Sequence, residues 1–445
     1  MTSQAKLWHP RLHPNALGKT GPFRIVGGEG VYVTAEDGER YIDGVSSLFN
    51  VFVGHNRPEI KQAITQQMDE LSYYPIHAGV SHPRAEELSI RLAELLEPEN
   101  MSNVMFGSCG SDAVEAALII SRQFWRISGQ SGKTKFGSLR FSYHGSSFGG
   151  FSVTGSPGYR ANYEPLLSDC FHIDAPFIYR NPYTNDPVKL AQACIDQAER
   201  EILFQGPESI ASIIAEPIQT AGGLIVPPED YWPKLRELCN RYDILLIADE
   251  VVTAFGRTGA LFASRDMGVA PDIMCFAKGI TSGYLPLGAT VFNQRIAEAF
   301  ITSDEKRGII MYGSTYAAHP LCCAAALANI AIITGEKLAD RAAILGNKLM
   351  DRIKPLEEMY AHVGEVRGRG LLVGIDLVED KRSRKSVDPA KGYADALVAV
   401  AKSEGVLIRS LGKLLVIAPP LIISEDELDR ICDALFKAFE TVNPT

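Results

Sequence analysis

The chain has 445 residues, of which 46% are hydrophobic and 22% are charged, and its formal net charge is -9 at pH 7. These values are typical of a globular protein with a large core, and the negative charge argues against a nucleic-acid partner, which would need a basic face. The eight cysteines show no metal-ligand spacing, the start MTSQAKLWHP has no apolar leader, and no apolar run reaches the roughly 18 residues of a membrane span. We therefore expect a cytoplasmic protein with reduced thiols, no metal site and no membrane partner.

The first part of the chain is expected to contain a β-hairpin and two helices. Residues 30–44, GVYVTAEDGERYIDG, place Asp37-Gly38 between two β-rich runs, which is a hairpin signal. Helices are expected over residues 58–71 and 84–96, because Pro58 suits a first helical turn and apolar side chains then recur every three or four residues.

Between about residues 102 and 295, short apolar runs alternate with amphipathic helical patterns. Strands are expected within residues 209–216, 243–252, 272–279 and 288–293, and a helix over 231–242 separates the first two. Near-continuous apolar strands joined by helices indicate a mostly parallel sheet that is covered on both faces.

The remainder of the chain is expected to form a separate C-terminal unit. Two long helices, residues 320–334 and 338–353, lead into strands within 371–377 and 414–420. A final helix over residues 425–442 follows, and Ser424 with Glu427 forms a capping box at its start.

Lys278 stands at the end of the apolar run DIMCFA and directly before a glycine. Such a lysine can simply be a solvated charge past a strand end, but Asp249 ends the preceding apolar run in the same way. In an open α/β sheet both would lie at the carboxyl edge, where ligands bind. An amine beside a carboxylate suits an aldehyde cofactor with a cationic ring nitrogen, which is pyridoxal phosphate. The turn Cys109-Gly110-Ser111 opens a helix from about Asp112 and offers backbone N–H groups to a phosphate.

A second pattern points to a different class of enzyme. Gly145-x-Ser147-x-Gly149 matches the nucleophile elbow of serine hydrolases. A triad also needs an acid and then a histidine later in the chain, and neither His319 nor His362 follows a recognisable strand. A serine hydrolase that uses Ser147 stays open as an alternative.

Several ordered segments together resemble the class III (ω-) aminotransferases, which are pyridoxal-phosphate enzymes of fold type I. The segments are GVYVTAEDGERYIDG, SCGSDAVEAAL, SYHGSSFGG, AEPIQTAGG, IADEVVTAFGRTG, AKGITSGYLPLGA, STYAAHPLCCAAALA and APPLIISEDEL, and they extend over nearly the whole chain. The resemblance implies an α/β fold with a large cofactor-binding domain over residues 66–330, built on a mostly parallel mixed sheet flanked by helices. A smaller α+β domain would combine residues 1–65 and 331–445.

The resemblance also implies how the cofactor is held. Lys278 would form its Schiff base, Asp249 would pair with the ring nitrogen, Val251 would lie under the ring and Tyr143 would stack on the other face. The other residues expected to bind the cofactor are Gly110, Ser111, His144, Glu216, Ser314 and Thr315. Thr315 would reach the phosphate of the partner subunit, in a homodimer with shared active sites that stands alone or within a tetramer.

The expected substrate residues are Arg409, Phe49 and Tyr143. Arg409 is similar to the movable arginine of the amine:pyruvate and β-alanine:pyruvate type, which binds a carboxylate through a planar fork. Val416 stands where members that use glutamate or ornithine carry a fixed arginine. Phe49 replaces a frequent tryptophan and Ser314 a usual phenylalanine, which predicts a roomier pocket.

The expected reaction is a ping-pong transfer of an amino group from a primary amine or ω-amino acid to a keto acid, most simply pyruvate. A decarboxylase, racemase or aminomutase on the same scaffold is the alternative that keeps the cofactor. The pattern does not distinguish a polyamine, β-alanine, taurine or an aromatic amine as donor.

Overall fold

The structure is a computed structural model that describes residues 6–17 and 21–443. Its largest sheet has seven strands in the order β4-β10-β9-β8-β7-β5-β6. These strands are β4 (Met101–Gly107), β5 (Lys135–Leu139), β6 (Cys170–Ile173), β7 (Ile210–Ala215), β8 (Leu245–Asp249), β9 (Ile273–Phe276) and β10 (Gly288–Asn293). Only β10 is antiparallel to its neighbours, β4 and β9, whereas all other pairs are parallel. The predicted mostly parallel mixed sheet is confirmed.

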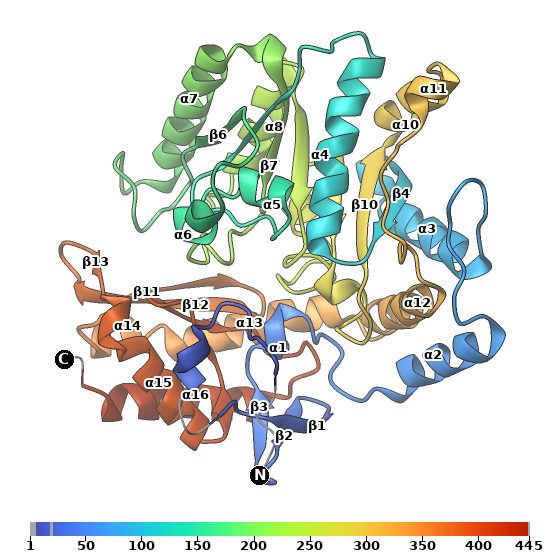
Figure 1. The fold of residues 1–445 in the computed structure, drawn as a ribbon. Helices are drawn as coiled ribbons and strands as arrows, with labels where there is room; N and C mark the ends of the chain where they lie inside the picture. Colours follow the sequence, from blue (N-terminus) through green and yellow to red (C-terminus); the bar gives the residue numbers. More distant parts are fainter. Residues whose placement is uncertain (1–5, 18–20, 444–445) are drawn as a thin grey trace.

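Helices cover both faces of this sheet (Figure 1). Along β8, Leu245 and Ile247 pack with helix α4 (Gly110–Ile127) and helix α10 (Gln294–Ile301). The alternate residues Leu246 and Ala248 belong to the core that includes helix α7 (Pro187–Gln205) and helix α8 (Tyr231–Arg241). Successive side chains of a strand point to opposite faces, so a strand buried on both sides must be apolar at every position.

Two smaller sheets bring the ends of the chain together. One consists of β1 (Ile25–Glu29), β2 (Tyr32–Ala35), β3 (Arg40–Asp43) and β14 (Val406–Leu407), and the parallel pairing of β3 with β14 joins N-terminal and C-terminal segments. The other consists of β11 (Val363–Arg369), β12 (Leu372–Asp380), β16 (Leu414–Ile417) and β15 (Arg409–Ser410), with β13 (Lys385–Ser386) paired to β12. Figure 1 shows the blue N-terminal hairpin beside the red C-terminal helices. The domain limits at residues 65 and 330 stay predictions.

The helices of this lower part are α13 (Leu338–Ile353), α14 (Leu356–Met359), α15 (Tyr393–Ser403) and α16 (Glu425–Thr441). The capping box at the start of α16 is present, with Ser424 and Glu427 bonded to each other's backbone. The predicted hairpin around Asp37-Gly38 is also present as β2 and β3.

The other helices connect the sheets. They are α1 (Ser46–Phe49), α2 (Pro58–Glu70), α3 (Pro83–Leu95), α5 (Phe148–Val153), α6 (Pro157–Arg160), α9 (Ala263–Asp266), α11 (Glu305–Gly308) and α12 (Pro320–Gly335). Short 3-10 helices are η1 (Pro14–Leu17), η2 (Glu97–Glu99), η3 (Ala161–Tyr163), η4 (Pro207–Ser209), η5 (Lys278–Ile280) and η6 (Pro389–Lys391). Within the described residues no single helix is long and apolar enough to cross a membrane, and α12 reaches that length only together with the segment 338–359, at a bend of 61°.

Candidate active site

The candidate site lies at one edge of the seven-stranded sheet, where several strands end together. Strands β4, β5, β7, β8 and β9 run in the same direction, so the segments that follow them emerge at the same edge. These segments carry Gly110 after β4, Tyr143 after β5, Glu216 after β7, Asp249 at the end of β8 and Lys278 after β9. This is the edge at which open α/β sheets bind their ligands.

Lys278 leaves β9 in an unusual backbone conformation and is partly buried. Its φ is 45°, in the left-handed region that a non-glycine residue adopts only when its surroundings hold it there. Burial lowers the pKa of the Lys278 amine, while the carboxylates of Asp249 and Glu216 oppose this shift. A lowered pKa increases the share of neutral amine, which is the nucleophilic form of a lysine.

Asp249 is buried and is held by two donors. His144 Nδ1 lies 2.8 Å from Asp249 Oδ2, and the Val251 N–H donates to Asp249 Oδ1 at 3.1 Å. An ionised carboxylate has about four lone-pair positions, so Asp249 can still accept from a further cationic N–H group. His144 Nε2 has no hydrogen-bond partner among the described residues, although it is buried. The sequence predicted both residues but not the bond between them.

Glu216 ties the loops after β5 and β7 together. Its carboxylate accepts the backbone N–H of Tyr143 at 3.0 Å and that of Thr220 at 3.1 Å. Burial raises the pKa of Glu216 to about 7, with the nearby Asp249 adding to the shift and His144 opposing it. The candidate site therefore contains two groups with shifted pKa values, the carboxyl of Glu216 and the amine of Lys278.

The start of helix α4 reaches the same edge of the sheet. The helix begins at Gly110, two residues before the expected Asp112. A Cβ on Gly110 would lie only 3.0 Å from Val251 Cγ1, so glycine allows the helix to approach the strand end. The Ser111 hydroxyl accepts the Ser146 N–H at 3.0 Å. The free N–H groups and the dipole of a helix start favour a bound anion such as a phosphate.

Tyr143, Tyr159 and Arg11 are in contact beside the candidate site, and Arg409 lies within electrostatic range of Arg11. The rings of Tyr143 and Tyr159 are 4.8 Å apart, and Arg11 Nη2 donates to the Tyr143 hydroxyl at 2.7 Å. Burial lowers the pKa of Arg409, and the charge of Arg11 lowers it further. The sequence pointed to Tyr143 and Arg409 but not to Arg11 or Tyr159. Arg11 lies in a segment without periodicity, so no local signal marks it.

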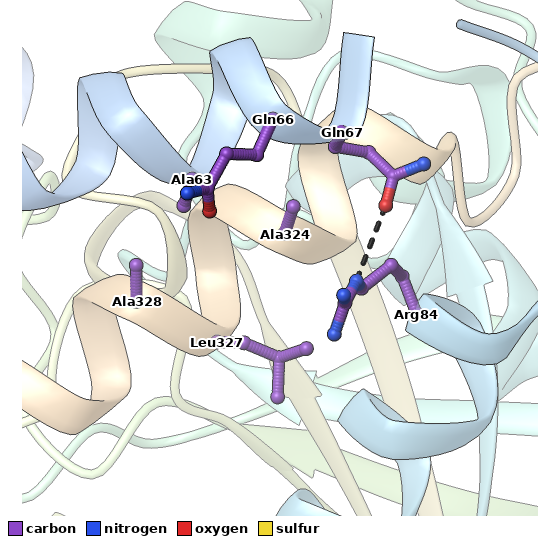
Figure 2. Close-up of a pocket in the computed structure, with 7 residues that line it drawn as sticks. All are labelled: Ala63, Gln66, Gln67, Arg84, Ala324, Leu327 and Ala328. Atoms are coloured by element: carbon purple, nitrogen blue, oxygen red, sulfur yellow. Dashed lines mark hydrogen bonds between the residues drawn. The ribbon is translucent and has the colours of Figure 1, made fainter. Parts of the chain in front are cut away.

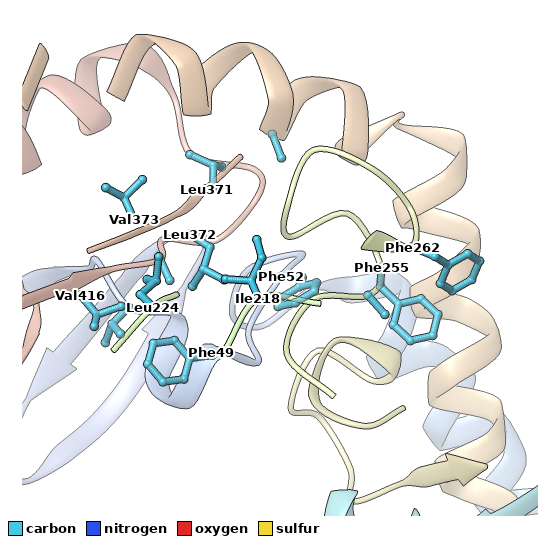
Figure 3. Close-up of a cluster of buried hydrophobic side chains, with 14 of the residues drawn as sticks. Phe49, Phe52, Ile218, Leu224, Phe255, Phe262, Leu371, Leu372, Val373 and Val416 are labelled. Atoms are coloured by element: carbon cyan, nitrogen blue, oxygen red, sulfur yellow. The ribbon is translucent and has the colours of Figure 1, made fainter. Parts of the chain in front are cut away.

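Phe49 lies in the core of the protein. It is 7% exposed and belongs to the same buried cluster as Leu224 and Val416. Figure 3 shows Phe49, Leu224 and Val416 close together in this cluster. Its φ of 61° is again left-handed, so a local turn directs the side chain. The expected contact of Phe49 with substrate stays a prediction.

Ser314 lies beside the start of α4 of its own chain, and Thr315 lies beside Tyr73. The Ser314 hydroxyl is 3.1 Å from the Ser108 hydroxyl, and the Thr315 carbonyl accepts the Tyr73 hydroxyl at 2.7 Å. These bonds order the segment within one chain. That Thr315 reaches the site of a partner subunit stays a prediction.

Ser147 does not have the surroundings of a hydrolase nucleophile. Its hydroxyl accepts the Gly150 N–H at 3.1 Å, as the N-cap of α5, and donates to Glu115 Oε2 at 2.6 Å. In the described ranges no histidine hydrogen-bonds to Ser147. A serine nucleophile needs a base that takes its proton, so the contacts do not favour the serine hydrolase.

A hollow also lies away from the sheet edge that holds the candidate site. It has a volume of about 170 Å³ and lies between α2, α3 and α12, as Figure 2 shows. Its lining residues are Ala63, Gln66, Gln67, Arg84, Ala324, Leu327 and Ala328. Arg84 is bonded to Gln67 and to Glu87, so its charge is already satisfied. We assign no role to this hollow.

Residues 17–439 match the model of the family Aminotransferase class-III. The adenosylmethionine-8-amino-7-oxononanoate aminotransferase of Geobacter sulfurreducens is 37% identical over 438 residues, which are 98% of this chain and 96% of that protein. The putrescine–pyruvate aminotransferase of Pseudomonas aeruginosa is 36% identical over 417 residues, which are 93% of this chain and 90% of that protein.

Solved structures with the same fold are also transaminases. An amine transaminase from an uncultivated Pseudomonas species, solved with pyridoxal phosphate bound, has a TM-score of 0.97 and 49% identity, with 99% of each chain covered. An (S)-enantioselective omega-transaminase from Thermomicrobium roseum has a TM-score of 0.93 and 39% identity, with 97% of this chain and 95% of that chain covered.

The residues at the sheet edge fit the cofactor of this family. Lys278 offers an amine, Asp249 offers a carboxylate for a cationic ring nitrogen, and the start of α4 at Gly110 offers an anion site. When bound, pyridoxal phosphate supplies an electron-withdrawing ring that stabilises negative charge on the substrate carbon. The chain therefore belongs to the class III aminotransferases, and it is a pyridoxal-phosphate-dependent enzyme of fold type I that moves an amino group from an amine donor to a keto acid.

Proposed function

We propose that the donor is a primary amine or an ω-amino acid and that the acceptor is pyruvate. The observation that carries this proposal is Arg409, on strand β15, whose side chain is partly buried. Within the described ranges no carboxylate forms an ion pair with Arg409, and the residue paired with it across the sheet is the apolar Val416. A guanidinium in such a place gains strongly from a substrate carboxylate.

An arginine without a carboxylate partner suits a reaction in which one substrate is anionic and the other need not be. The carboxylate of the keto acid would bind at Arg409, whereas a simple amine would occupy the same space without it. The names of two relatives support this division: one is an amine transaminase and another is a putrescine–pyruvate aminotransferase.

The protein's own groups supply the proton chemistry. Lys278, whose pKa burial lowers, would take the proton from the substrate carbon and return it, as a general base and then a general acid. Asp249 would keep a ring nitrogen protonated through its negative charge, and His144 Nδ1 holds that carboxylate in place. Glu216 fixes the backbone of Tyr143 and thereby the aromatic wall of the site.

A donor screen tests the proposal. The purified holoenzyme is incubated with putrescine, β-alanine or 1-phenylethylamine, together with pyruvate or 2-oxoglutarate, and alanine and glutamate are quantified by chromatography. We expect alanine from pyruvate with at least one of these donors and little glutamate, with no product from a Lys278→Ala variant. Glutamate without alanine would contradict the choice of acceptor. Carbon dioxide release or racemisation without amino transfer would instead support the decarboxylase or racemase.

The proposal includes a homodimer in the cytoplasm. Exposed apolar side chains gather on two segments that are bonded to each other, including Met311 at 91% exposed, Tyr316 at 62% and Tyr74 at 50%. Apolar groups in such a cluster favour contact with another protein surface, here a second copy of the chain. All eight cysteines are free thiols, which suits a reducing compartment. Sedimentation velocity would measure a monomer if the dimer is wrong, and cell fractionation tests the compartment.

A further inference from the structure

The N-terminal segment places one arginine directly in the candidate site. Arg11 lies in a turn before η1 and has a φ of 59°, a left-handed conformation that turns the chain sharply. Its guanidinium donates to the Tyr143 hydroxyl at 2.7 Å and lies 5.0 Å and 5.1 Å from the ring centroids of Tyr143 and Tyr159. Two aromatic rings and one hydroxyl thus hold the cation in a defined position.

Arg11 and Arg409 are two cations for which the described residues supply no carboxylate partner. The Arg11 guanidinium lies 5.1 Å from the centroid of the Tyr159 ring. Burial lowers the pKa of Arg409, and the charge of Arg11 lowers it further. In the part of the chain that the structure describes, no carboxylate forms an ion pair with either guanidinium. Arg11 is exposed and Arg409 is partly buried. Their like charges repel each other, and an anion bound between them removes this repulsion.

The position of Arg11 relative to Lys278 indicates which anion fits. The Arg11 charge also lowers the pKa of Lys278, so the two groups lie within electrostatic range. In a 2-oxo acid the carboxylate is bonded directly to the carbonyl carbon that receives the amino group. The group that binds this carboxylate must therefore lie near the lysine, and Arg11 is anchored at Tyr143, in the segment after β5 that reaches the same sheet edge as Lys278.

We propose that Arg11, together with Arg409, binds the carboxylate of the keto-acid acceptor and so determines the preference for 2-oxo acids over neutral carbonyl compounds. This inference rests on the proposed function, because it names a residue that selects the acceptor of that reaction. A guanidinium has five N–H donors, and the single bond to Tyr143 leaves enough of them for a two-pronged contact with a carboxylate.

The test compares charged and neutral acceptors in matched variants. Arg11→Gln, Arg409→Gln and the double variant are measured beside Arg24→Gln, which removes an exposed arginine that is paired with Glu36 in the same N-terminal region. For each holoenzyme, kcat/KM is determined with pyruvate and with butanal as acceptor. The dissociation constant of propionate, an unreactive carboxylate, is measured by calorimetry, with propionamide as its neutral counterpart.

We expect Arg11→Gln to lower the ratio of kcat/KM for pyruvate to that for butanal by at least tenfold, the size of one lost charge-assisted hydrogen bond. The dissociation constant of propionate should rise by a similar factor in Arg11→Gln. Arg24→Gln should leave the kcat/KM ratio and the propionate dissociation constant as in the wild type. In the double variant the kcat/KM ratio should fall by less than the product of the two single effects. If kcat/KM falls by the same factor for pyruvate and for butanal in Arg11→Gln, the arginine only holds the N-terminal segment and the proposal is wrong. If the wild type prefers 2-oxoglutarate, the choice of pyruvate fails, and the same ratio measured with 2-oxoglutarate still tests Arg11.

Discussion

An Asp249→Asn substitution removes one negative charge from the site while it keeps the shape of the side chain. The carboxylate uses Oδ1 for the Val251 N–H and Oδ2 for His144 Nδ1. An asparagine has only one acceptor oxygen, so its NH2 group must face one of these two donors. The contact that faces this NH2 group loses its charge-assisted hydrogen bond, and the cationic ring nitrogen of the cofactor loses its counter-charge.

The two consequences differ in size. Loss of a hydrogen bond to a charged group costs about 1.5–3 kcal/mol. For 445 residues the entropy of unfolding is about 0.9 kcal/mol/K, so the melting temperature should fall by only about 2–3 °C. Loss of the counter-charge acts on the proton-transfer step itself, and we expect kcat to fall by about 10²- to 10⁴-fold, which corresponds to about 3–5 kcal/mol.

A matched variant separates these effects. Asp272 is also buried in the same sheet, but it lies at the opposite end of β9, where it pairs with Arg236 at 2.7 Å and accepts the Leu246 N–H at 2.8 Å. Asp272→Asn should lower the melting temperature as Asp249→Asn does, with kcat close to that of the wild type. The assay is kcat of transamination at saturating cofactor, beside thermal melting. A value of kcat within threefold of wild type in Asp249→Asn, or an equal loss in Asp272→Asn, would refute the role of Asp249.

Three further variants test other parts of the structure. Burial raises the pKa of Glu216 to about 7 from 4.5, so between these pH values the native state keeps a proton that the unfolded chain has lost. The free energy of unfolding should therefore fall by up to about 3 kcal/mol as pH rises from 4.5 to 7. Thermal melting of the cofactor-free protein should show this fall in the wild type but not in Glu216→Gln. Arg257→Met should lower the melting temperature by about 2–5 °C, because the buried carbonyls of Leu371 and Pro419 lose their donor. A melting temperature above that of the wild type would mean that removal of the buried charge outweighs the loss of these bonds. Ser147→Ala should keep transamination and melt about 1 °C lower through its lost N-cap; an inactive but folded variant would contradict this.

The central strands were predictable because burial on both faces leaves a continuous apolar run. The observed β7, β8, β9 and β10 all lie within the expected ranges. The direction of β10 was not predictable, since a fully buried strand has the same apolar pattern whichever way it runs. Helix α7 has a capping Asp186 and Pro187 at its first position but was not predicted, although both are start signals.

The candidate site was predictable only where a residue ends a regular element. Asp249 and Lys278 each close an apolar strand, so the parallel topology alone brings them to one edge. The bond between His144 and Asp249 depends on the path of a loop, which has no periodicity to indicate it. Arg11 meets Tyr143 across 132 positions of sequence, and no local pattern encodes a contact of that length.

The charges around Lys278 suggest how one site can serve both halves of the reaction. Burial and the charge of Arg11 lower the pKa of the lysine, whereas Asp249 and Glu216 raise it. An uncharged amine donor leaves this balance unchanged, so burial still acts in favour of the neutral amine, which is the form that removes a proton. A carboxylate bound at Arg11 would offset the effect of that cation, so we expect the pKa of Lys278 to be higher with a bound keto acid than with an uncharged donor. The contact proposed to select the acceptor would thus also act on the base that moves the proton in the second half of the reaction.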